Sequence, residues 1–225
     1  MLEIRPGTFA HASGALWLAD SGTLLAADVH LGYGWALRRR GQLGPVGDDL
    51  VCRKLMETAQ ELQPGEIVFL GDLVHAPRPA PEERHEVEST LRTLAEKCKV
   101  VVVLGNHDRG FVRDFPSLPV EICRMWRGGN GELAVHGDRE IPEAEHVIIG
   151  HLHPALGVTD HAGASHRLPV FISGDVLTLL PAYSPLAAGC DIRDGIAIRP
   201  HGAKVFAASG IRVVPLGGLE RFSRR

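Results

Sequence analysis

The sequence predicts an α/β fold in which helices lie outside a largely parallel sheet. Up to Leu104, short apolar runs alternate with amphipathic helical patterns, which is typical of parallel strands joined by helices. Short strand-like runs with almost no helical pattern follow in the second half. Because no repeat, low-complexity segment or linker interrupts the chain, we expect a single domain over residues 1–225.

The chain opens with a predicted hairpin and a predicted helix. Alternating apolar residues at 15–18, a turn at 20–22 and an apolar run at 23–27 indicate two antiparallel strands. Asp48 is the expected N-cap of a helix that stops before Pro64-Gly65. The apolar positions that recur at helical spacing in it are Val51, Leu55, Met56, Ala59 and Leu62.

A strand, a helix and another strand are expected next. The apolar run 66–70 predicts the first strand, and Pro81 opens a helix with Val87, Leu91, Leu94 and Cys98 on one face. Four consecutive valines within residues 99–104 indicate a strand buried on both faces. Later, Gly128-Gly129-Asn130-Gly131 predicts a hairpin turn. Further short strands are expected at 132–135, 146–149, 170–173, 176–180, 196–198, 204–207 and 211–214.

Composition places the chain among ordinary globular proteins and excludes few functions. Apolar residues make up 44% and charged residues 23% of the sequence, and no apolar run approaches a membrane span. The N-terminal residues lead into no apolar stretch, so we expect no signal peptide and no membrane association. Four scattered cysteines without a C-x-x-C pair indicate reduced thiols and a cytoplasmic location. The net charge of −3 argues against tight, sequence-independent binding to duplex DNA.

Five short polar motifs carry the chemical information, and most follow an apolar run. Residues i and i+2 of a strand point the same way, so Asp28 and His30 can reach one metal ion together. Asp72 has two carboxylate oxygens and can bridge two ions, while Asn106 offers an amide oxygen. The motifs are Asp28-Val29-His30, Gly71-Asp72-Leu73-Val74-His75, Gly105-Asn106-His107-Asp108, His136-Gly137 and Gly150-His151-Leu152-His153.

Carboxylate, amide and imidazole ligands without thiolate suit Mn²⁺, Fe or Zn²⁺ better than Ca²⁺. Competing phosphate and acyl chemistries leave no comparable pattern. No cysteine is followed six positions later by arginine, no Gly-Lys dipeptide occurs, and no Gly-x-Ser-x-Gly elbow is present. The sequence therefore favours a two-metal hydrolytic centre.

The motifs, in this order, resemble those of the calcineurin-like metallophosphoesterase superfamily. The resemblance implies a four-layer α/β/β/α sandwich of two facing mixed sheets flanked by helices. It implies that a hydroxide shared between two ions is the nucleophile. It also implies that His107, oriented by Asp108, lies near the phosphate and neutralises charge or protonates the leaving oxygen. His75 is expected to support the ligands. The implied ligands are Asp28, His30, Asp72 and His153 for one ion, and Asp72, Asn106, His136 and His151 for the other.

Three further segments, residues 31–43, 166–171 and 179–183, resemble the bacterial ligase-associated phosphoesterases of DNA repair, the PdeM or MPE branch. That resemblance implies a Mn²⁺-dependent phosphodiesterase with endonuclease activity on single-stranded DNA. It also implies a functional link to a DNA ligase and a helicase of one repair gene cluster. The segment Ser184-Pro185 departs from the branch, and so does Ala187-Ala188-Gly189, which affects the expected substrate contacts but not the metal ligands.

The segment after the first motif has the chemistry of a single-strand binder. Tyr33 and Trp35 can stack on unpaired bases, and Arg38, Arg39 and Arg40 can follow backbone phosphates. A loop that packs its aromatic rings on the core, beside a solvated charge run, is the alternative. Residues 109–127 allow no interpretation. Two other functions stay open, a small-molecule nucleotide or pyrophosphate phosphohydrolase and an inactive scaffold, although the presence of His107 disfavours the scaffold.

Overall fold

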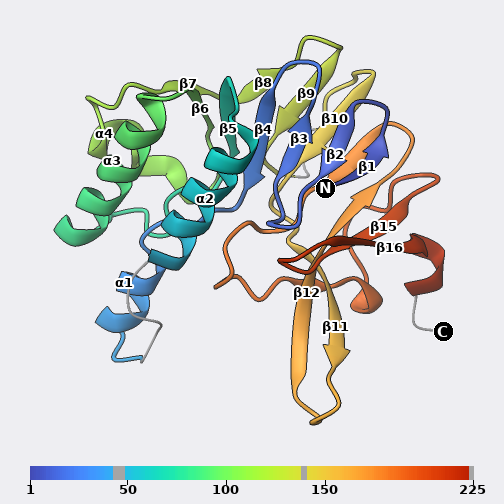
Figure 1. Cartoon of the computed structure of the whole chain (residues 1–225). Helices are drawn as coiled ribbons and strands as arrows, with labels where there is room; N and C mark the ends of the chain where they lie inside the picture. Colours follow the sequence, from blue (N-terminus) through green and yellow to red (C-terminus); the bar gives the residue numbers. More distant parts are fainter. Residues whose placement is uncertain (43–48, 138–140, 223–225) are drawn as a thin grey trace.

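Two mixed β-sheets face each other in the middle of the molecule, and the longer helices cover one outer side (Figure 1). The computed structural model describes residues 1–42, 49–137 and 141–222. The four-layer architecture expected from the sequence is confirmed. Its fourth layer is thin, because the second sheet is covered on its outer side mainly by two 3₁₀ helices, η2 (Ile192–Asp194) and η3 (Leu219–Phe222).

The first sheet has seven strands that follow one another in chain order. Its first four strands pair antiparallel, and the last four pair parallel. The third and fourth strands of this sheet pair antiparallel, which confirms the hairpin predicted at residues 15–27. The strands are β1 (Leu2–Arg5), β2 (Thr8–Ala10), β3 (Leu16–Leu18), β4 (Thr23–Ala27), β5 (Glu66–Leu70), β6 (Lys99–Val103) and β7 (Glu121–Cys123).

Four α-helices are described: α1 (Tyr33–Arg39), α2 (Asp49–Leu62), α3 (Pro81–Ala95) and α4 (Phe111–Asp114), with a 3₁₀ turn, η1 (Asp108–Gly110), before the last. The two predicted helices, α2 and α3, are confirmed. The expected cap Asp48 lies outside the described residues, and α3 ends before Cys98, which therefore lies beyond the helix. Within the described parts of the chain, no helix is long and apolar enough to cross a membrane.

The second sheet holds the remaining strands, and here the sequence-based prediction is partly wrong. Residues 196–198 form no strand but follow η2 as irregular chain, with Ile196 and Ile198 packed against the outer core. The last strand begins at Val213, because Ile211 lies exposed in the preceding turn. The strands are β8 (Met125–Arg127), β9 (Glu132–Val135), β10 (His146–Ile149), β11 (Pro154–Thr159), β12 (Ser165–Ser173), β13 (Leu177–Leu179), β14 (Cys190–Asp191), β15 (Lys204–Ala208) and β16 (Val213–Gly218).

The strand pairing in this second sheet confirms one predicted turn and shows that the sheet is mixed. β8 and β9 are antiparallel, which confirms the hairpin turn expected at residues 128–131. β10 is parallel to both β9 and β13, so the sheet is mixed, like the first. β11 and β12 form a long hairpin that projects from the body of the molecule (Figure 1).

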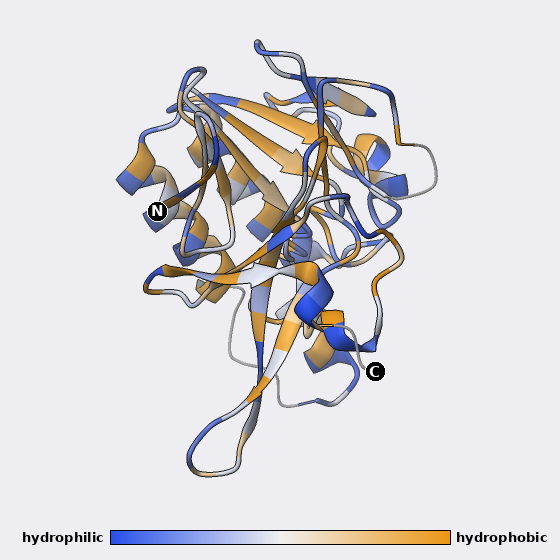
Figure 2. Ribbon diagram, turned by 90° about the vertical axis from the view of Figure 1, so that its right-hand side faces the viewer, coloured by the Kyte–Doolittle hydropathy of each residue, from blue (hydrophilic) through white to orange (hydrophobic). Residues whose placement is uncertain are grey.

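Three apolar clusters hold the layers together, one at each boundary between layers. Leu55 of α2 and Leu91 of α3 pack on the outer face of the first sheet. Val68 and Phe171 belong to a second cluster, which fills the space between the sheets. A third cluster lies between the second sheet and the 3₁₀ helices, and the sheets are correspondingly apolar in Figure 2. Burial of these side chains is the main force that holds the two sheets face to face.

The carboxyl ends of five strands, from both sheets, meet at one edge of this sandwich. β4, β5 and β6 run parallel in the first sheet, as do β9 and β10 in the second, and each leads into one of the polar motifs. Two glycines permit the strand ends of the two sheets to approach each other closely. A β-carbon on Gly150 would lie 2.9 Å from Cβ of Ala27 and 3.0 Å from the carbonyl oxygen of Leu70. A β-carbon on Gly71 would overlap the ring of His136.

Replacement of Gly71 by alanine should therefore destabilise the protein and disturb metal binding. Gly71 has φ +71°, and its added methyl group would overlap the imidazole of His136. Gly41→Ala is the matched control, since Gly41 also has φ +71° but no atom of the described residues lies within 4 Å of its new β-carbon. Gly41→Ala should cost about 1–2 kcal/mol of unfolding free energy through backbone strain alone, and Gly71→Ala more. Equal shifts of the thermal midpoint with unchanged metal content would contradict the steric explanation.

Candidate metal centre

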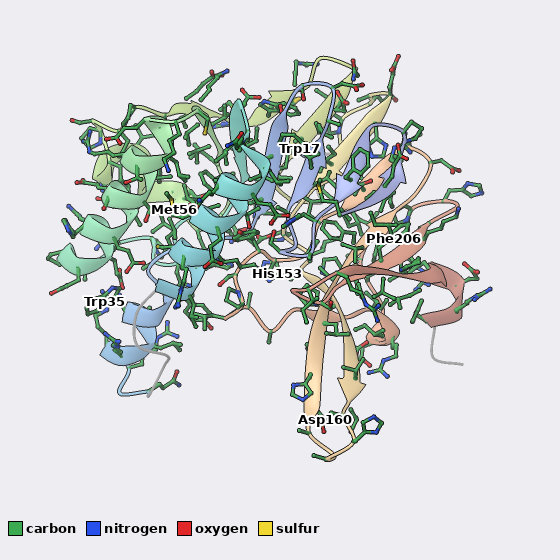
Figure 3. The ribbon with its side chains drawn as sticks, in the orientation of Figure 1. Trp17, Trp35, Met56, His153, Asp160 and Phe206 are labelled. Carbon is green, nitrogen blue, oxygen red and sulfur yellow. The ribbon has the colours of Figure 1, made fainter. Side chains whose placement is uncertain are left out.

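The first set of ligands combines the end of β4 with the loop before β11. Asp28, His30 and His153 place potential ligand atoms within 4.8 Å of one another. Nε2 of His153 lies 3.0 Å from Oδ1 of Asp28, whose side chain is fully buried. His153 lies near the middle of the molecule, whereas Trp35 of α1 and Asp160 at the hairpin tip lie farther out (Figure 3). The structure thus brings together three of the four residues expected around the first ion.

The second set comes from β5, β6, β9 and β10. Asp72, His136 and His151 again have potential ligand atoms within 4.8 Å of one another. Nε2 of His136 lies 3.5 Å from Oδ1 of Asp72 and 3.2 Å from Oδ1 of Asn106. All four residues expected around the second ion therefore meet here. Because Asp72 Oδ2 also lies 3.9 Å from the ring of His107, its carboxylate stands in the middle of the cluster.

The backbone at these positions is strained. Among the described residues, six that are not glycine have φ in the left-handed region, and five of them are expected ligands. Their φ angles run from +44° for His153 to +69° for His151, with Asp28, His30 and Asp72 between them. Such residues cost about 1–3 kcal/mol each and cluster at functional sites. Strain concentrated on the ligands is a structural sign of function that is independent of the sequence motifs.

Hydrogen bonds from one loop to another fix the two carboxylates. The backbone N–H of His151 donates to Oδ2 of Asp28 at 2.8 Å, and the N–H of His107 donates to Oδ1 of Asp72 at 2.8 Å. Burial alone would raise the pKa of Asp72, but the hydrogen bonds and charges of His136 and His107 outweigh it and lower that pKa to about 2. Asp72 is therefore ionised at neutral pH, as a metal ligand must be.

Burial and the two carboxylates shift the pKa values of these imidazoles in opposite directions, and the balance differs from ring to ring. Burial tends to lower the pKa of His136 and His153, yet contacts with Asp72 and Asp28 raise both pKa values. At His30, burial dominates and lowers the pKa to about 4, so the ring is neutral and has a lone pair for a cation. Its Nδ1 is buried without a hydrogen-bond partner among the described residues. Two carboxylates, four imidazoles and one amide therefore suit two divalent cations.

The structure corrects the role expected for Asp108. Its carboxylate accepts the backbone N–H groups of Leu73, Val74 and Gly105, at 3.3, 3.1 and 2.9 Å, and so holds two motif loops together. The ring of His107 is oriented by a different group, because its Nδ1–H donates to the carbonyl oxygen of His75 at 2.8 Å. His75 thus supports the site mainly through its backbone. Burial keeps the pKa of Asp108 above its usual value despite these hydrogen bonds.

The segment expected to be a nucleic-acid-binding loop is the helix α1, and its contacts divide the expected residues into two groups. The ring of Tyr33 stacks on His75, with centroids 3.9 Å apart. Nε1 of Trp35 donates to Glu86 at 3.0 Å, and the guanidinium of Arg39 pairs at 2.7 Å with Glu83, whose side chain is only 1% exposed. Trp35 and Arg39 therefore dock α1 on α3, and their contact with a substrate stays a prediction.

The other two arginines of the run are differently placed. The guanidinium of Arg38 lies 4.9 Å above the ring centroid of Trp35, and Arg40 is exposed. These two side chains, with Tyr33, remain candidates for contact with a substrate that extends beyond the metal centre.

Sequence reasoning missed a half-buried lysine, Lys54, which lies behind the segment that pairs with Asp28. Nζ of Lys54 on α2 donates to the carbonyl oxygen of Tyr183 at 2.6 Å, and burial lowers the pKa of Lys54 to about 8. The N–H groups of Tyr183 and Ser184 in turn donate to the carbonyl oxygens of Ala27 and Asp28. Lys54 lies on the helix face that carries Leu55 and Thr58 toward the core, and a charge on such a face is the signal that could have revealed it.

Residues 23–176 match the sequence model of the calcineurin-like phosphoesterases. The chain belongs to the calcineurin-like phosphoesterase family. This match confirms the resemblance inferred from the motifs, and it identifies the protein as a metal-dependent phosphoesterase. The family uses divalent metal ions, and the two ligand sets described above lie within or close to the matched residues.

One solved structure resembles this phosphoesterase over almost its full length. The crystal structure of Pseudomonas putida nuclease MPE is 26% identical, covers 93% of this chain and 94% of its own, and superposes with a TM-score of 0.72. This agrees with the branch indicated by the sequence. A comparison with curated proteins gives no match.

Two other solved structures are less similar. A predicted phosphoesterase from Streptococcus pneumoniae TIGR4 is 14% identical, with a TM-score of 0.32, and covers 82% of this chain and 81% of its own. Vps29 from Entamoeba histolytica, complexed with zinc, is 13% identical, with a TM-score of 0.36, and covers 86% of this chain and 96% of its own.

His107→Ala should separate metal binding from catalysis. Because His107 belongs to neither ligand set, we expect metal content near that of the unaltered enzyme and a rate lower by about 10²–10⁴, the usual contribution of a general acid. Asp72→Ala, which removes the central carboxylate, should lose metal and activity together. Metal analysis and steady-state kinetics on a chromogenic diester measure both. Unchanged turnover in His107→Ala would exclude the assigned role.

Proposed function

We propose that this phosphoesterase is a Mn²⁺-dependent phosphodiesterase that cuts single-stranded DNA internally. The observation that carries the proposal is its likeness to Pseudomonas putida nuclease MPE over nearly the whole of both chains. The arrangement of ligands and of α1 beside them supports it. The donor set, with carboxylate, amide and imidazole but no thiolate, suits Mn²⁺, and also Fe or Zn²⁺.

In this proposal Asp28, His30, Asp72 and His153 hold one ion, and Asp72, Asn106, His136 and His151 hold the other. When bound, the ions supply a water nucleophile of lowered pKa and neutralise charge on the phosphoryl oxygens. The chain fixes its ligands beforehand, since the carboxylates of Asp28 and Asp72 are held by backbone N–H groups from loops that carry other ligands. This preorganisation reduces the rearrangement needed to reach the transition state.

His107 is the proposed proton donor to the leaving oxygen. Its Nδ1–H is committed to the carbonyl oxygen of His75, so a proton at Nε2 is the one available for transfer. The side chain is 36% exposed and lies beside Asp72, and a phosphate bound to the centre would therefore be within its reach. Asp108 contributes by holding the loop of His107 against the loop of Asp72.

The helix α1 is the proposed wall for the polynucleotide. It begins three residues after His30 and presents Tyr33 and Arg38, and exposed Arg40 follows its last residue, while Arg39 and Trp35 attach it to α3. Stacking and phosphate contacts of this kind bind single strands with little sequence preference. A role in cytoplasmic DNA repair beside a DNA ligase and a helicase is part of the proposal, and the ligase-associated motifs support it.

The deciding experiment compares three substrates in the presence of Mn²⁺: circular single-stranded DNA, a chromogenic phosphodiester and a nucleotide pyrophosphate. We expect linearisation of the circle together with turnover of the diester, because a circle has no end for an exonuclease. An intact circle with rapid turnover of the pyrophosphate would instead indicate the alternative small-molecule phosphohydrolase. Chelation of metal should abolish all activity and be reversed by added Mn²⁺.

The arginines of α1 should matter for DNA and not for small substrates. Combined Arg38→Ala and Arg40→Ala should weaken binding to single-stranded DNA and lower the slope of log affinity against log salt by about 0.7 for each lost phosphate contact. Turnover of the small diester should stay within about twofold, since that substrate is too short to reach α1. Arg127→Ala on β8, at the opposite end of the molecule (Figure 1), is the control. Equal losses on both substrates would mean that the arginines are structural.

A further inference from the structure

The backbone of Asp28 is held by hydrogen bonds on both sides, and its φ of +53° lies in a region that residues other than glycine rarely adopt. Its N–H donates to the carbonyl oxygen of Gly71 at 3.1 Å, and its own carbonyl oxygen accepts the N–H of Ser184 at 3.3 Å. The carbonyl oxygen of Ala27, one residue earlier, accepts the N–H of Tyr183 at 2.8 Å. Tyr183 and Ser184 therefore help to keep Asp28 in this conformation.

One side chain of α2 holds Tyr183 in turn. Nζ of Lys54 donates to the carbonyl oxygen of Tyr183 at 2.6 Å and lies 4.1 Å from the centroid of the ring of the same residue. That ring is fully buried in the apolar cluster between α2 and the first sheet. Its hydroxyl lies 3.0 Å from Oγ1 of Thr58, one turn farther along α2. Lys54 thus contacts Tyr183 at its backbone, and Thr58 contacts it at the far end of its ring.

A single peptide group connects the ammonium of Lys54 to Asp28. The carbonyl that accepts from Lys54 and the N–H that donates to Asp28 both belong to the peptide between Tyr183 and Ser184. A charged donor at one end of a peptide group polarises it and strengthens the hydrogen bond at the other end. Burial lowers the pKa of Lys54 to about 8, which leaves most of its charge in place at neutral pH.

We propose that Lys54 is a positioning residue for the metal ion that Asp28 holds. Without the ammonium, the hydrogen bond from Ser184 weakens and Asp28 is freer to leave its strained conformation, so the ion must also reorder its ligand when it binds. Groups that orient a ligand from behind typically change metal affinity by about 10–100-fold. The proposal rests on the proposed ligand role of Asp28 and is independent of which phosphoester is cleaved.

The test measures Mn²⁺ binding in the absence of substrate, by equilibrium dialysis with elemental analysis. The unaltered protein should bind two ions per chain. In Lys54→Met, which keeps the apolar stem but removes the charge, one binding step should weaken by about tenfold or more, and the other should stay within about twofold. The second step is spared because Asn106, His136 and His151, which hold the other ion with Asp72, lie on other loops.

Thr58→Val is the matched control for a loss of packing or stability. It removes a hydrogen bond from the same helix to the same tyrosine, but at the end of the side chain that is remote from the Tyr183–Ser184 peptide. Thermal unfolding measures the stability of both variants, and Mn²⁺ binding to Thr58→Val should stay within about twofold in both steps. Equal weakening of Mn²⁺ binding in Lys54→Met and Thr58→Val, or none in Lys54→Met, would overturn the proposal.

Asp28→Asn identifies the binding step that belongs to Asp28, and Lys54→Met should weaken that same step. Unchanged binding in Asp28→Asn would overturn the ligand role of Asp28 and the proposal with it. A step that weakens in Asp28→Asn but not in Lys54→Met would overturn the role of Lys54 alone. If Lys54→Met does not fold, Lys54→Gln, which is also neutral, takes its place. Because no substrate is present, failure to cleave DNA would contradict the proposed function and leave the role of Lys54 standing.

Discussion

The metal centre depends on how closely the two sheets approach at one edge. Gly150 follows β10 and lies against Ala27 and Leu70 of the first sheet, and Gly71 follows β5 and lies against His136 of the second. With any larger residue at these two points, the strand ends would have to separate. The hydrogen bond from the His151 N–H to the carboxylate of Asp28, a proposed ligand, then joins the two sheets. Every other property of the site follows from this approach, because no single sheet supplies a complete ligand set.

The left-handed backbone at five proposed ligands follows from the same close approach of the two sheets. A chain leaving a parallel strand must turn at once if its side chain is to face the opposite sheet. Asp28, His30, Asp72, His151 and His153 make that turn without being glycine. The cost, about 1–3 kcal/mol for each residue, is offset by burial in the three apolar clusters. The centre is thus organised by the core and does not depend on a flexible loop.

Much of this arrangement is predictable from the sequence because it depends on local patterns. Four valines before Gly105-Asn106-His107-Asp108 indicate both a buried strand and the polar turn after it, and the structure contains both. Contacts between distant residues are not predictable in this way. The pairing of Arg39 with Glu83 joins residues far apart in the sequence, and it turns an apparent charge run into a docking contact. The Nδ1–H of His107 donates to the carbonyl oxygen of His75 and not to Asp108, because any acceptor within reach can take this hydrogen bond.

The ligands are divided along the chain, and this has a consequence for synthesis. A ribosome that has released residues up to Asn106 has produced both carboxylates but none of His136, His151 and His153. At about 5–20 residues per second, these imidazoles follow only seconds later. Residues 182–184, which pair with the end of β4, follow later still. A nascent chain that still lacks these three histidines therefore cannot assemble either proposed ligand set. The metal pair would then bind late in folding and would not guide its start.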